Sequence, residues 1–458
     1  MRCKSRSFTA FRTTILAMAC ITSSAGAQAT PRFHLITLDP GHFHASLVQK
    51  FMYDDVDSVV HVFAPPGDDV AEHRKRIDAF NSRADRPTHW VERVYTGADF
   101  LDRMLAGKPG NIVVIAGNNA RKSEYIARSV EAGLNVLADK PMVRTPADLV
   151  RLERTFRMAR DKHVLLYDIM TERSEVTTQL QRELSMHPEV FGTLVKGTPN
   201  DPAINMVSTH YFSKMVAGAQ LKRPEWFFDV QQEGEGIVDV TTHLVDLVQW
   251  EAFPDRVLRS SDVTMLRAQR WPTAITREQF TRLTGAMDFP AYLQRDVKDG
   301  VLQVKSNGEM TYRVLGVHAH LSVVWNFEAP KGGDTHYSSM RGTKSTLVIR
   351  QGAEEGWKPA LYVEPRPSHD TKAHGAALAA AVTALAQKYP GIGLRRDGKR
   401  WAVTIPAVFD VGHEAHFAQV TNRYLAWLRG EPMPAWEVPN MITKYATIMK
   451  AYTMSGGR

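Results

Sequence analysis

Cysteine is nearly absent from this chain: its 458 residues include only Cys3 and Cys20. Both lie in an N-terminal segment that has the composition of a removable export signal. If that segment is cleaved, the mature chain carries no thiol. Disulfide bonds, cysteine-ligated zinc and a cysteine nucleophile are then excluded together, and any chemistry must come from other side chains.

Long apolar runs are also scarce, and the one near the N-terminus is too short to span a membrane. Four basic residues precede the apolar run 15–21, and residues 25–27 form a small-x-small cleavage site. This pattern is typical of a secretory signal peptide, so we expect residues 1–27 to be removed and the protein to be exported to the periplasm. Lipidation at Cys20 is the less favoured alternative, because residues 17–19 match a lipobox poorly.

Removal of residues 1–27 takes away four basic and no acidic residues, which lowers the net charge from +8 to +4. The basic character is therefore partly an export signal, and we expect no nucleic-acid partner. A hydrophobic content of 43% and a charged content of 23% are ordinary for a soluble globular protein without a membrane span. The length predicts two domains.

Strands and helices alternate through residues 32–166, which predicts a Rossmann-like, doubly wound parallel sheet. Glycine is scarce where such a fold binds a dinucleotide. After the first expected strand (33–38), the three glycine positions of the usual turn hold Asp39, Gly41 and His44. Gly41 keeps the position where the backbone must approach a pyrophosphate. Asp68 and Asp69 follow the second strand too late to decide between NAD and NADP.

Residues 167–458 have a different character and predict an α+β domain built on a largely antiparallel open sheet. Asn307-Gly308 and Asp397-Gly398 are expected hairpin turns. Helices are expected at 413–429 and 441–454. The fold class is therefore α/β, with an N-terminal Rossmann-like domain and a C-terminal α+β domain. Its open sheet is a possible surface for homo-oligomer formation.

Two groups of charged residues are candidates for chemistry. Asp139 and Lys140 follow a short apolar strand, at the sheet edge where open α/β folds bind ligands. On an expected helix, Asp239, His243 and Asp246 are four and three residues apart and share one face. A histidine between two carboxylates is expected to have a raised pKa and a fixed tautomer, which suits a general acid/base. The alternative is a buried histidine with a structural role.

A series of motifs follows along the chain: the Gly41 turn, Asn118-Asn119, Gly133, Asp139-Lys140-Pro141 and Gly236…Asp239…His243. Together and in this order they resemble the motifs of the glucose–fructose oxidoreductase / inositol dehydrogenase (Gfo/Idh/MocA) family. The resemblance covers nearly the whole mature chain and implies an exported member with a family-specific C-terminal domain. It implies a Rossmann domain that binds NAD or NADP and a second domain that closes a sugar site. Two features depart from the family pattern: Asp139 stands where glutamate is usual, and in the glycine-poor turn Asp39 and His44 replace small residues.

By this resemblance Lys140 hydrogen-bonds the reacting hydroxyl and the nicotinamide ribose, His243 is the acid/base and Asp239 contacts the substrate. We expect burial to lower the pKa of Lys140 so that it can exchange a proton. The residues expected to bind the cofactor are Gly41, His42, Phe43, Asn118, Asn119, Asp139 and Lys140. Those expected to bind a carbohydrate substrate are Arg173, His210, Trp226 and Asp246.

These assignments predict an NAD(P)-dependent oxidoreductase acting on a secondary hydroxyl of a sugar or glycoside. Outside the cytoplasm there is no nicotinamide pool, so we expect a tightly bound cofactor and a hydride that returns within each cycle. The first alternative is an NAD-dependent enzyme that cleaves a glycoside by transient oxidation and elimination. The second is a non-catalytic sugar-binding relative. Histidines are numerous, but none has a known zinc spacing, so no metal site is predicted.

Overall fold

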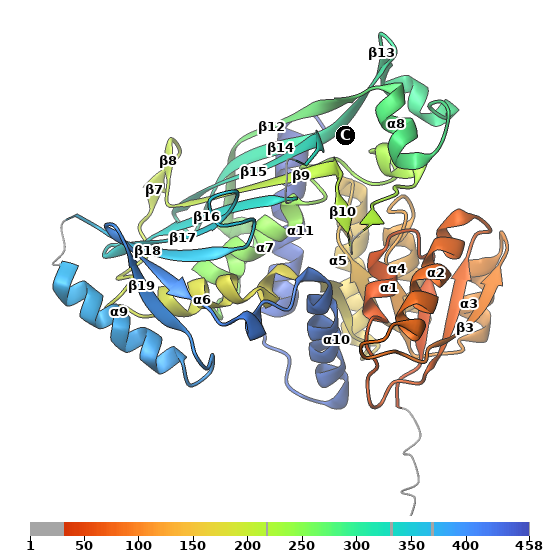
Figure 1. Cartoon of the computed structure of the whole chain (residues 1–458). Coiled ribbons are helices and arrows are strands. Elements are labelled where there is room, and N and C mark those ends of the chain that lie inside the picture. The colour runs from red at the N-terminus through yellow and green to blue at the C-terminus, as the bar shows by residue number, and fades with distance from the viewer. Residues whose placement is uncertain (1–31, 217–218, 330–332, 368–370, 458) are drawn as a thin grey trace, which may run out of the picture.

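The computed structural model describes residues 32–457, apart from 217–218, 330–332 and 368–370. The predicted signal peptide and Cys20 lie outside the described residues. Figure 1 shows a smaller domain on a parallel sheet beside a larger domain on a broad, strongly twisted sheet. Both predicted fold types are confirmed.

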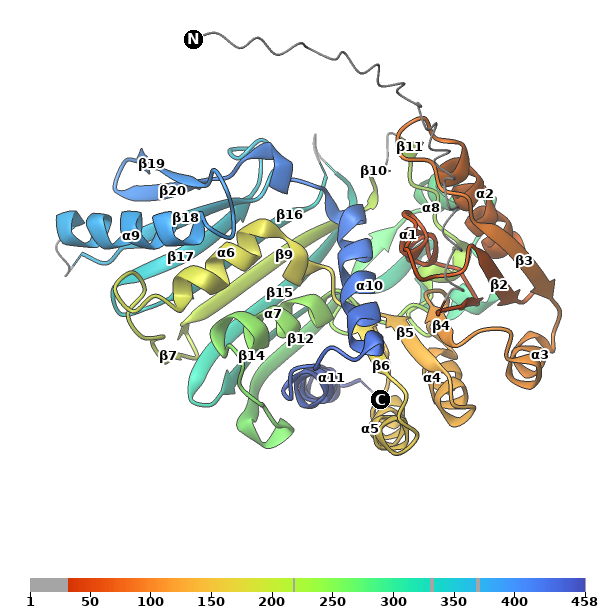
Figure 2. The ribbon, with the colours of Figure 1, turned by 90° about the horizontal axis from the view of Figure 1, so that it is seen from below.

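The first sheet has six parallel strands in the order β3-β2-β1-β4-β5-β6. In chain order the strands are β1 (Leu35–Leu38), β2 (Val59–Ala64), β3 (Val91–Thr96), β4 (Ile112–Ile115), β5 (Asn135–Asp139) and β6 (Leu166–Ile169). The helices between them are α1 (His44–Val48), α2 (Asp68–Ser82), α3 (Phe100–Gly107), α4 (Lys122–Glu131) and α5 (Pro146–Asp161). Figure 2 shows α1 and α2 on one face of the sheet and α3, α4 and α5 on the other.

This strand order places the functional edge of the domain. The order reverses between β1 and β4, and in open α/β sheets such a reversal opens a crevice at the carboxyl ends of the strands. The central strands are short apolar runs covered on both sides, and all four residues of β4 are at most 1% exposed. The sheet continues through β6 to Ile169, three residues beyond the expected domain boundary.

The second domain is built on a ten-stranded sheet in the order β12-β14-β15-β9-β16-β17-β18-β20-β19, with β13 paired to β14. Its strands are β9 (Ile204–Ser213), β12 (Val263–Ile275), β13 (Val297–Lys298), β14 (Val301–Val314), β15 (Val317–Glu328), β16 (Thr335–Arg341), β17 (Ser345–Gln351), β18 (Ala360–Pro365), β19 (Gly393–Asp397) and β20 (Arg400–Thr404). The pairing is antiparallel except between β15 and β9, which run parallel. Two-stranded pairs form between β7 (Gly197–Thr198) and β8 (Asp201–Pro202), and between β10 (Met215–Val216) and β11 (Ala219–Gln220).

The helices of the second domain lie on one face of this sheet, at its end beside β13, or against the first domain (Figures 1 and 2). They are α6 (Val176–Ser185), α7 (Thr241–Ala252), α8 (Arg277–Thr284), α9 (Thr371–Leu385), α10 (His413–Arg429) and α11 (Glu437–Met454). Figure 2 shows α10 between the two sheets and α11 beside α5. Arg429 on α10 pairs with Asp55 of the first domain, and the Tyr424 hydroxyl donates to the Leu165 carbonyl. The end of the chain therefore joins the two domains.

The predicted hairpin at Asn307-Gly308 is wrong, because both residues lie inside β14. A Cβ on Gly308 would lie 2.5 Å from the Ile237 Cβ, and one on Gly236 would lie 1.7 Å from the Ser306 carbonyl oxygen. These glycines let β14 cross closely over the segment that leads into α7. The hairpin turn is instead Asp299-Gly300 between β13 and β14, with φ of +51° and +76°. The turn at Asp397-Gly398 is confirmed.

Candidate functional site

The loops that follow β4 and β5, at the carboxyl edge of the first sheet, contact a segment of the second domain that runs from Gln232 to Asp239. The turn after β1 lies against Trp226 of the same domain. Across this boundary the Lys140 ammonium donates a short hydrogen bond to Asp239, and the two side chains are 10% and 7% exposed. The pair is therefore shielded but still reaches solvent. It joins the two domains where the crevice opens.

The pKa of Lys140 is raised, not lowered as expected. Burial by itself would lower it, but the charges of Asp239 and Asp139, with the hydrogen bond to Asp239, outweigh that effect. Lys140 is therefore an ammonium ion in the resting site. It can donate hydrogen bonds to an oxygen atom, but it does not begin as a base.

The pKa of His243 is also opposite to expectation: it lies well below the ordinary value. Burial has the largest effect, and the positive charge of Lys140 adds to it, while Asp139 and Asp246 oppose it. Helix α7 begins at Thr241, so Asp239 lies in the turn before the helix rather than on a shared helical face. Within the described residues the His243 Nδ1 atom has no hydrogen-bond partner. With its lowered pKa, the His243 imidazole is neutral in the resting site, and the charge of Lys140 opposes its protonation.

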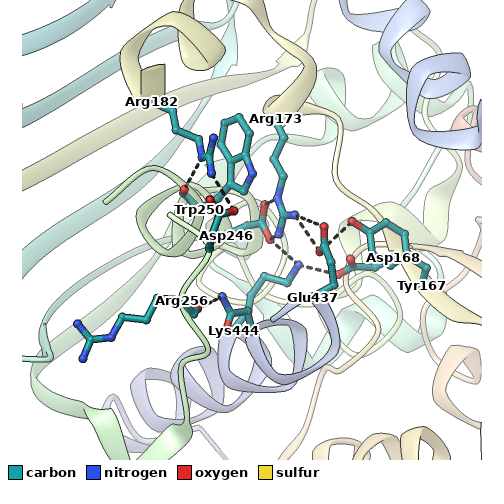
Figure 3. A network of polar contacts seen from close by, with 11 residues as sticks. Tyr167, Asp168, Arg173, Arg182, Asp246, Trp250, Arg256, Glu437 and Lys444 are labelled. Carbon is teal, nitrogen blue, oxygen red and sulfur yellow. Dashed lines mark hydrogen bonds and ion pairs between the residues drawn. The ribbon is translucent and has the colours of Figure 1, made fainter. Parts of the chain in front are cut away.

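Arg173 and Asp246 lie in a buried ion network behind the crevice (Figure 3). The Arg173 guanidinium donates to both Asp246 oxygens at 2.6 and 2.7 Å and to Glu437 on α11 at 3.0 Å. Lys444 Nζ lies 2.7 Å from Asp168 and 2.9 Å from Asp246. These contacts give Arg173 and Asp246 a structural role that ties β6, α7 and α11 together. Both side chains are fully engaged in this network, so we do not assign them to the substrate.

The turn after β1 lies against the second domain. A Cβ on Gly41 would lie 2.8 Å from Asp69 Oδ2 and 3.0 Å from the Trp226 ring. Trp226 Nε1 donates to the same Asp69 oxygen at 2.8 Å. Trp226 therefore sits beside the expected cofactor turn, whereas the sequence assigned it to the sugar. Helix α1 has only five residues, so its N-terminus adds little to anion binding here.

Asp39 occupies the first glycine position of the turn, and its carboxylate is buried rather than exposed there. Its φ is +51°, and its carboxylate accepts a hydrogen bond from the Tyr125 hydroxyl at 3.2 Å. Burial raises the pKa of Asp39 to about 6, against the opposing effect of the Tyr125 hydrogen bond. The side chain is turned toward α4 and 8% exposed, which reduces its repulsion of a nearby phosphate.

Asn118 and Asn119 hold the segment that precedes Asp239. Asn118 donates to the Gln232 side chain and Asn119 to the Glu233 carbonyl, each at 2.7 Å. The buried Asn119 Oδ1 has no partner among the described residues. Glu233 was missed by the sequence reasoning. Burial, then the charge of Asp239, raises the pKa of its carboxyl to about 8.

The two departures from the family pattern meet in space. His44 Nδ1 lies 2.9 Å from Asp139 Oδ2, and both side chains are buried. A longer histidine therefore fills the position of a small residue, and a shorter aspartate replaces glutamate. Phe43 packs edge-on against the His44 ring at 4.5 Å between centroids. Asp139 is thus held by His44, and its charge contributes to the raised pKa of Lys140.

This compensation predicts strong coupling between the two positions. We expect Asp139→Glu alone to lower the free energy of unfolding by about 1–3 kcal/mol, because an added methylene has no room. His44→Ala alone is also destabilising, since it leaves a cavity and removes a partner of Asp139. The double variant should recover part of the loss, with a coupling of about 1 kcal/mol or more in urea unfolding. Strictly additive effects would contradict the compensation.

His210 lies on β9 in a separate polar cluster. Its ring nitrogens contact Asp334 Oδ2 at 3.1 Å and Ser208 Oγ at 2.8 Å, and Lys214 pairs with the same Asp334 oxygen. His210 is held in place but has both nitrogens engaged. On α10, the His413 side chain is 46% exposed and lies 3.4 Å from Glu172. The sequence did not single out Glu172 or Asp334, because their partners are far along the chain.

Residues 180–456 match a family model described as "Putative oxidoreductase C terminal domain". A crystal structure of "a putative oxidoreductase from Parabacteroides merdae ATCC 43184" is 51% identical, with 93% of this chain and 98% of that chain covered and a TM-score of 0.91. A comparison with curated proteins finds no match. None of the helices in the described part of the chain has the length and apolarity of a transmembrane span.

More distant structures share the fold. GenD2 from gentamicin A biosynthesis, in complex with NAD, is 16% identical, with 94% of this chain and 96% of that chain covered and a TM-score of 0.56. KijD10, a 3-ketoreductase from Actinomadura kijaniata in complex with NADP and TDP-benzene, is 13% identical, with 92% and 97% covered and a TM-score of 0.54. The two-domain architecture therefore recurs in proteins of very different sequence.

Proposed function

Since the chain belongs to the oxidoreductase family defined by that C-terminal domain model, we propose that it is an NAD(P)-dependent oxidoreductase of the Gfo/Idh/MocA type. Its proposed substrate is a sugar or glycoside that reacts at a secondary hydroxyl. The observation that carries the proposal is the Lys140–Asp239 pair, which joins the two domains at the carboxyl edge of the parallel sheet. The charge of Lys140 also contributes to the lowered pKa of the buried His243.

The residues at this edge fit a nicotinamide cofactor. Gly41 has no side chain, so its backbone can approach a pyrophosphate once the Asp69 carboxylate and the Trp226 ring, which pack against it here, move aside. The Asn119 Oδ1 atom is buried without a protein partner. We assign Gly41, His42, Phe43, Asn119 and Lys140 to the cofactor, together with Trp226 from the second domain. When bound, the nicotinamide supplies the hydride acceptor and donor.

The chain's own residues handle the proton and the oxygen. In the oxidative direction the hydroxyl proton passes to the imidazole of His243, which is neutral at physiological pH. The Lys140 ammonium donates a hydrogen bond to the same oxygen and stabilises the negative charge that develops there. Asp239 keeps Lys140 charged and oriented. In the reductive direction the same proton returns from His243 to the oxygen.

The low pKa of His243 predicts where activity is lost at acid pH. A base with a lowered pKa stays deprotonated until the pH falls below that pKa. The acid limb of kcat should therefore lie well below pH 6.5, the ordinary value for histidine. His243→Ala should lower kcat by about 10²-fold or more and remove this limb. An unchanged acid limb in that variant would show that another group is the base. The profile is measured with buffers matched in ionic strength.

We further propose that the protein is exported and returns the hydride within each cycle, because residues 1–27 have the pattern of a signal peptide. One observation favours the alternative of glycoside cleavage without net redox. With a pKa of about 8, Glu233 holds a proton at neutral pH, and elimination of a leaving group requires an acid.

A panel of 4-nitrophenyl glycosides tests the function. The purified protein is incubated with each glycoside without added NAD, and nitrophenol release, oxidised glycoside and reduced cofactor are measured. Oxidised glycoside with reduced cofactor supports the oxidoreductase, and nitrophenol without net reduction supports glycoside cleavage. If protein loaded with NAD or NADP binds glycosides but forms neither nitrophenol nor oxidised glycoside, both enzymatic functions are contradicted. That result would indicate a non-catalytic sugar-binding relative.

A further inference from the structure

A cluster of potential metal ligands lies beside the Lys140–Asp239 pair. His42, His44 and Asp139 each offer one ligand atom, and these atoms lie within 4.8 Å of one another. The two histidines are in the turn after β1, and Asp139 ends β5. The spacing of histidines along the chain does not reveal this group, because Asp139 follows His44 by 95 residues.

We propose that His42, His44 and Asp139 bind a divalent transition metal. Asp139 Oδ2 lies 2.9 Å from His44 Nδ1 and 3.6 Å from His42 Nδ1. Ligands bonded to one metal at about 2.1 Å are separated by about 3.0–3.4 Å in octahedral or tetrahedral geometry. These two separations bracket that range, and the nitrogens of the two histidines lie within 4.8 Å of each other. Side-chain shifts of about an ångström would bring the three atoms onto a common ion.

Of the three proposed ligands, His42 has the side chain with an unsatisfied ring nitrogen. Its Nδ1 atom is buried, and no hydrogen-bond partner for it exists among the described residues. The ring stands edge-on to the His44 ring at 4.0 Å between centroids. A metal ion would satisfy the His42 nitrogen and replace the present hydrogen bond between His44 and Asp139. Buried polar atoms in native proteins almost always have a partner, which makes this orphan atom an indication of a ligand.

The ligand set identifies the class of ion. Two imidazole nitrogens and one carboxylate oxygen suit zinc, iron, cobalt, nickel or manganese, whereas magnesium and calcium prefer oxygen ligands. Two cations lie nearby: Lys122 donates to the Asp139 carbonyl at 3.1 Å, and Lys140 is paired with Asp239. Their charges oppose a dication, so we expect weaker affinity than at a site without neighbouring ammonium groups.

Three protein ligands leave coordination positions free. The His42 side chain is 17% exposed, compared with 10% for His44 and 5% for Asp139, so solvent or a ligand would reach the ion most easily beside His42. A sugar hydroxyl or ketone oxygen in the crevice could bind there, and the ion would then assist Lys140 in stabilising negative charge on oxygen. This role for the ion rests on the proposed function, whereas metal binding itself does not.

Cobalt(II) is a suitable probe, because its absorption spectrum reports the ligands. Full-length protein without a histidine tag is treated with a chelator and dialysed. It is then titrated with CoCl₂ in the absence of sugar, with calorimetry and the visible spectrum as readouts. We expect one cobalt ion per chain with nitrogen-containing ligation. His42→Ala and His44→Ala should each weaken binding by at least about 10-fold, the range seen when a metal site loses supporting contacts.

His89→Ala is the matched control, because His89 is an exposed histidine of the same domain. It should bind cobalt like the wild type. Circular dichroism of each variant confirms that it is folded. The metal site would be overturned if the wild type bound no cobalt, or if His42→Ala bound cobalt as tightly as the wild type. Cofactor content is measured on the same preparations, so failure of the metal site and failure of the proposed function are separate results.

Discussion

Replacing Lys140 by alanine is expected to lower kcat/KM by about 10²–10⁴-fold while the cofactor stays bound. The Lys140 ammonium is paired with Asp239 across the domain boundary and has a raised pKa. It is thus the cation best placed to hold the reacting oxygen as charge develops. Most of the loss should appear in kcat, since the interaction strengthens in the transition state. Steady-state kinetics on the reactive glycoside measure the loss.

Lys162→Ala is the matched control for this variant. Lys162 is an exposed lysine at the end of α5, and its removal should leave kcat and KM unchanged. Asp239→Asn provides a second comparison, because it keeps Lys140 but removes the charge that raises the Lys140 pKa. We expect Asp239→Asn to retain more activity than Lys140→Ala at pH values where the lysine remains protonated. Near wild-type activity in Lys140→Ala would remove the central assignment.

Replacing Arg173 by alanine is expected to lower the free energy of unfolding by about 3–5 kcal/mol, the cost of breaking a buried ion pair. Asp246 and Glu437 would each lose a guanidinium partner, and both are 2% exposed. Lys444 still contacts Asp246, and the Tyr167 hydroxyl still donates to Glu437 at 3.2 Å, but this hydroxyl carries no charge to replace the guanidinium (Figure 3). Urea unfolding with circular dichroism measures the change.

The same network predicts how stability depends on pH. Burial alone would raise the pKa of Asp246, but Arg173 and Lys444 outweigh it and hold the pKa well below 3.8. An acid with a lowered pKa contributes stability above its unfolded value, and that contribution is lost as the pH falls below about 3.8. Arg173→Ala should make this acid dependence smaller.

Arg160→Ala is the control for the ion network. Arg160 pairs with Asp161 on the surface, where the side chains are 75% and 67% exposed. Exposed pairs contribute about 0–1 kcal/mol, so this variant should unfold almost like the wild type. A similarly small effect of Arg173→Ala would contradict the structural role and reopen Arg173 as a substrate contact.

Local pattern was enough to predict much of the fold. Helix α10 spans the residues expected for it, and β5 is the short apolar strand expected before Lys140. The turn at Asn307-Gly308 was wrong for a tertiary reason. Its glycine is required by the crossing of Ile237 over β14, and a single sequence does not reveal that contact.

The order of motifs along the chain was enough to predict which residues meet at the site. It was not enough to predict pKa shifts that depend on charges from several elements. Lys140 and Asp239 could be paired from the resemblance, although they are 99 residues apart. The direction of the Lys140 and His243 pKa shifts could not, because each depends on the balance between burial and charges from both domains. The partners of Arg173 and Asp246 include α11, near the end of the chain, which no local pattern indicated.

Mass spectrometry of the small molecules released from the purified protein by denaturation tests the central claim most directly. The account predicts NAD(H) or NADP(H) at close to one molecule per folded chain, retained through gel filtration. It also predicts that Lys140→Ala retains the cofactor while losing activity. Protein that is purified without a nicotinamide cofactor and binds neither NAD nor NADP when they are added would contradict the account.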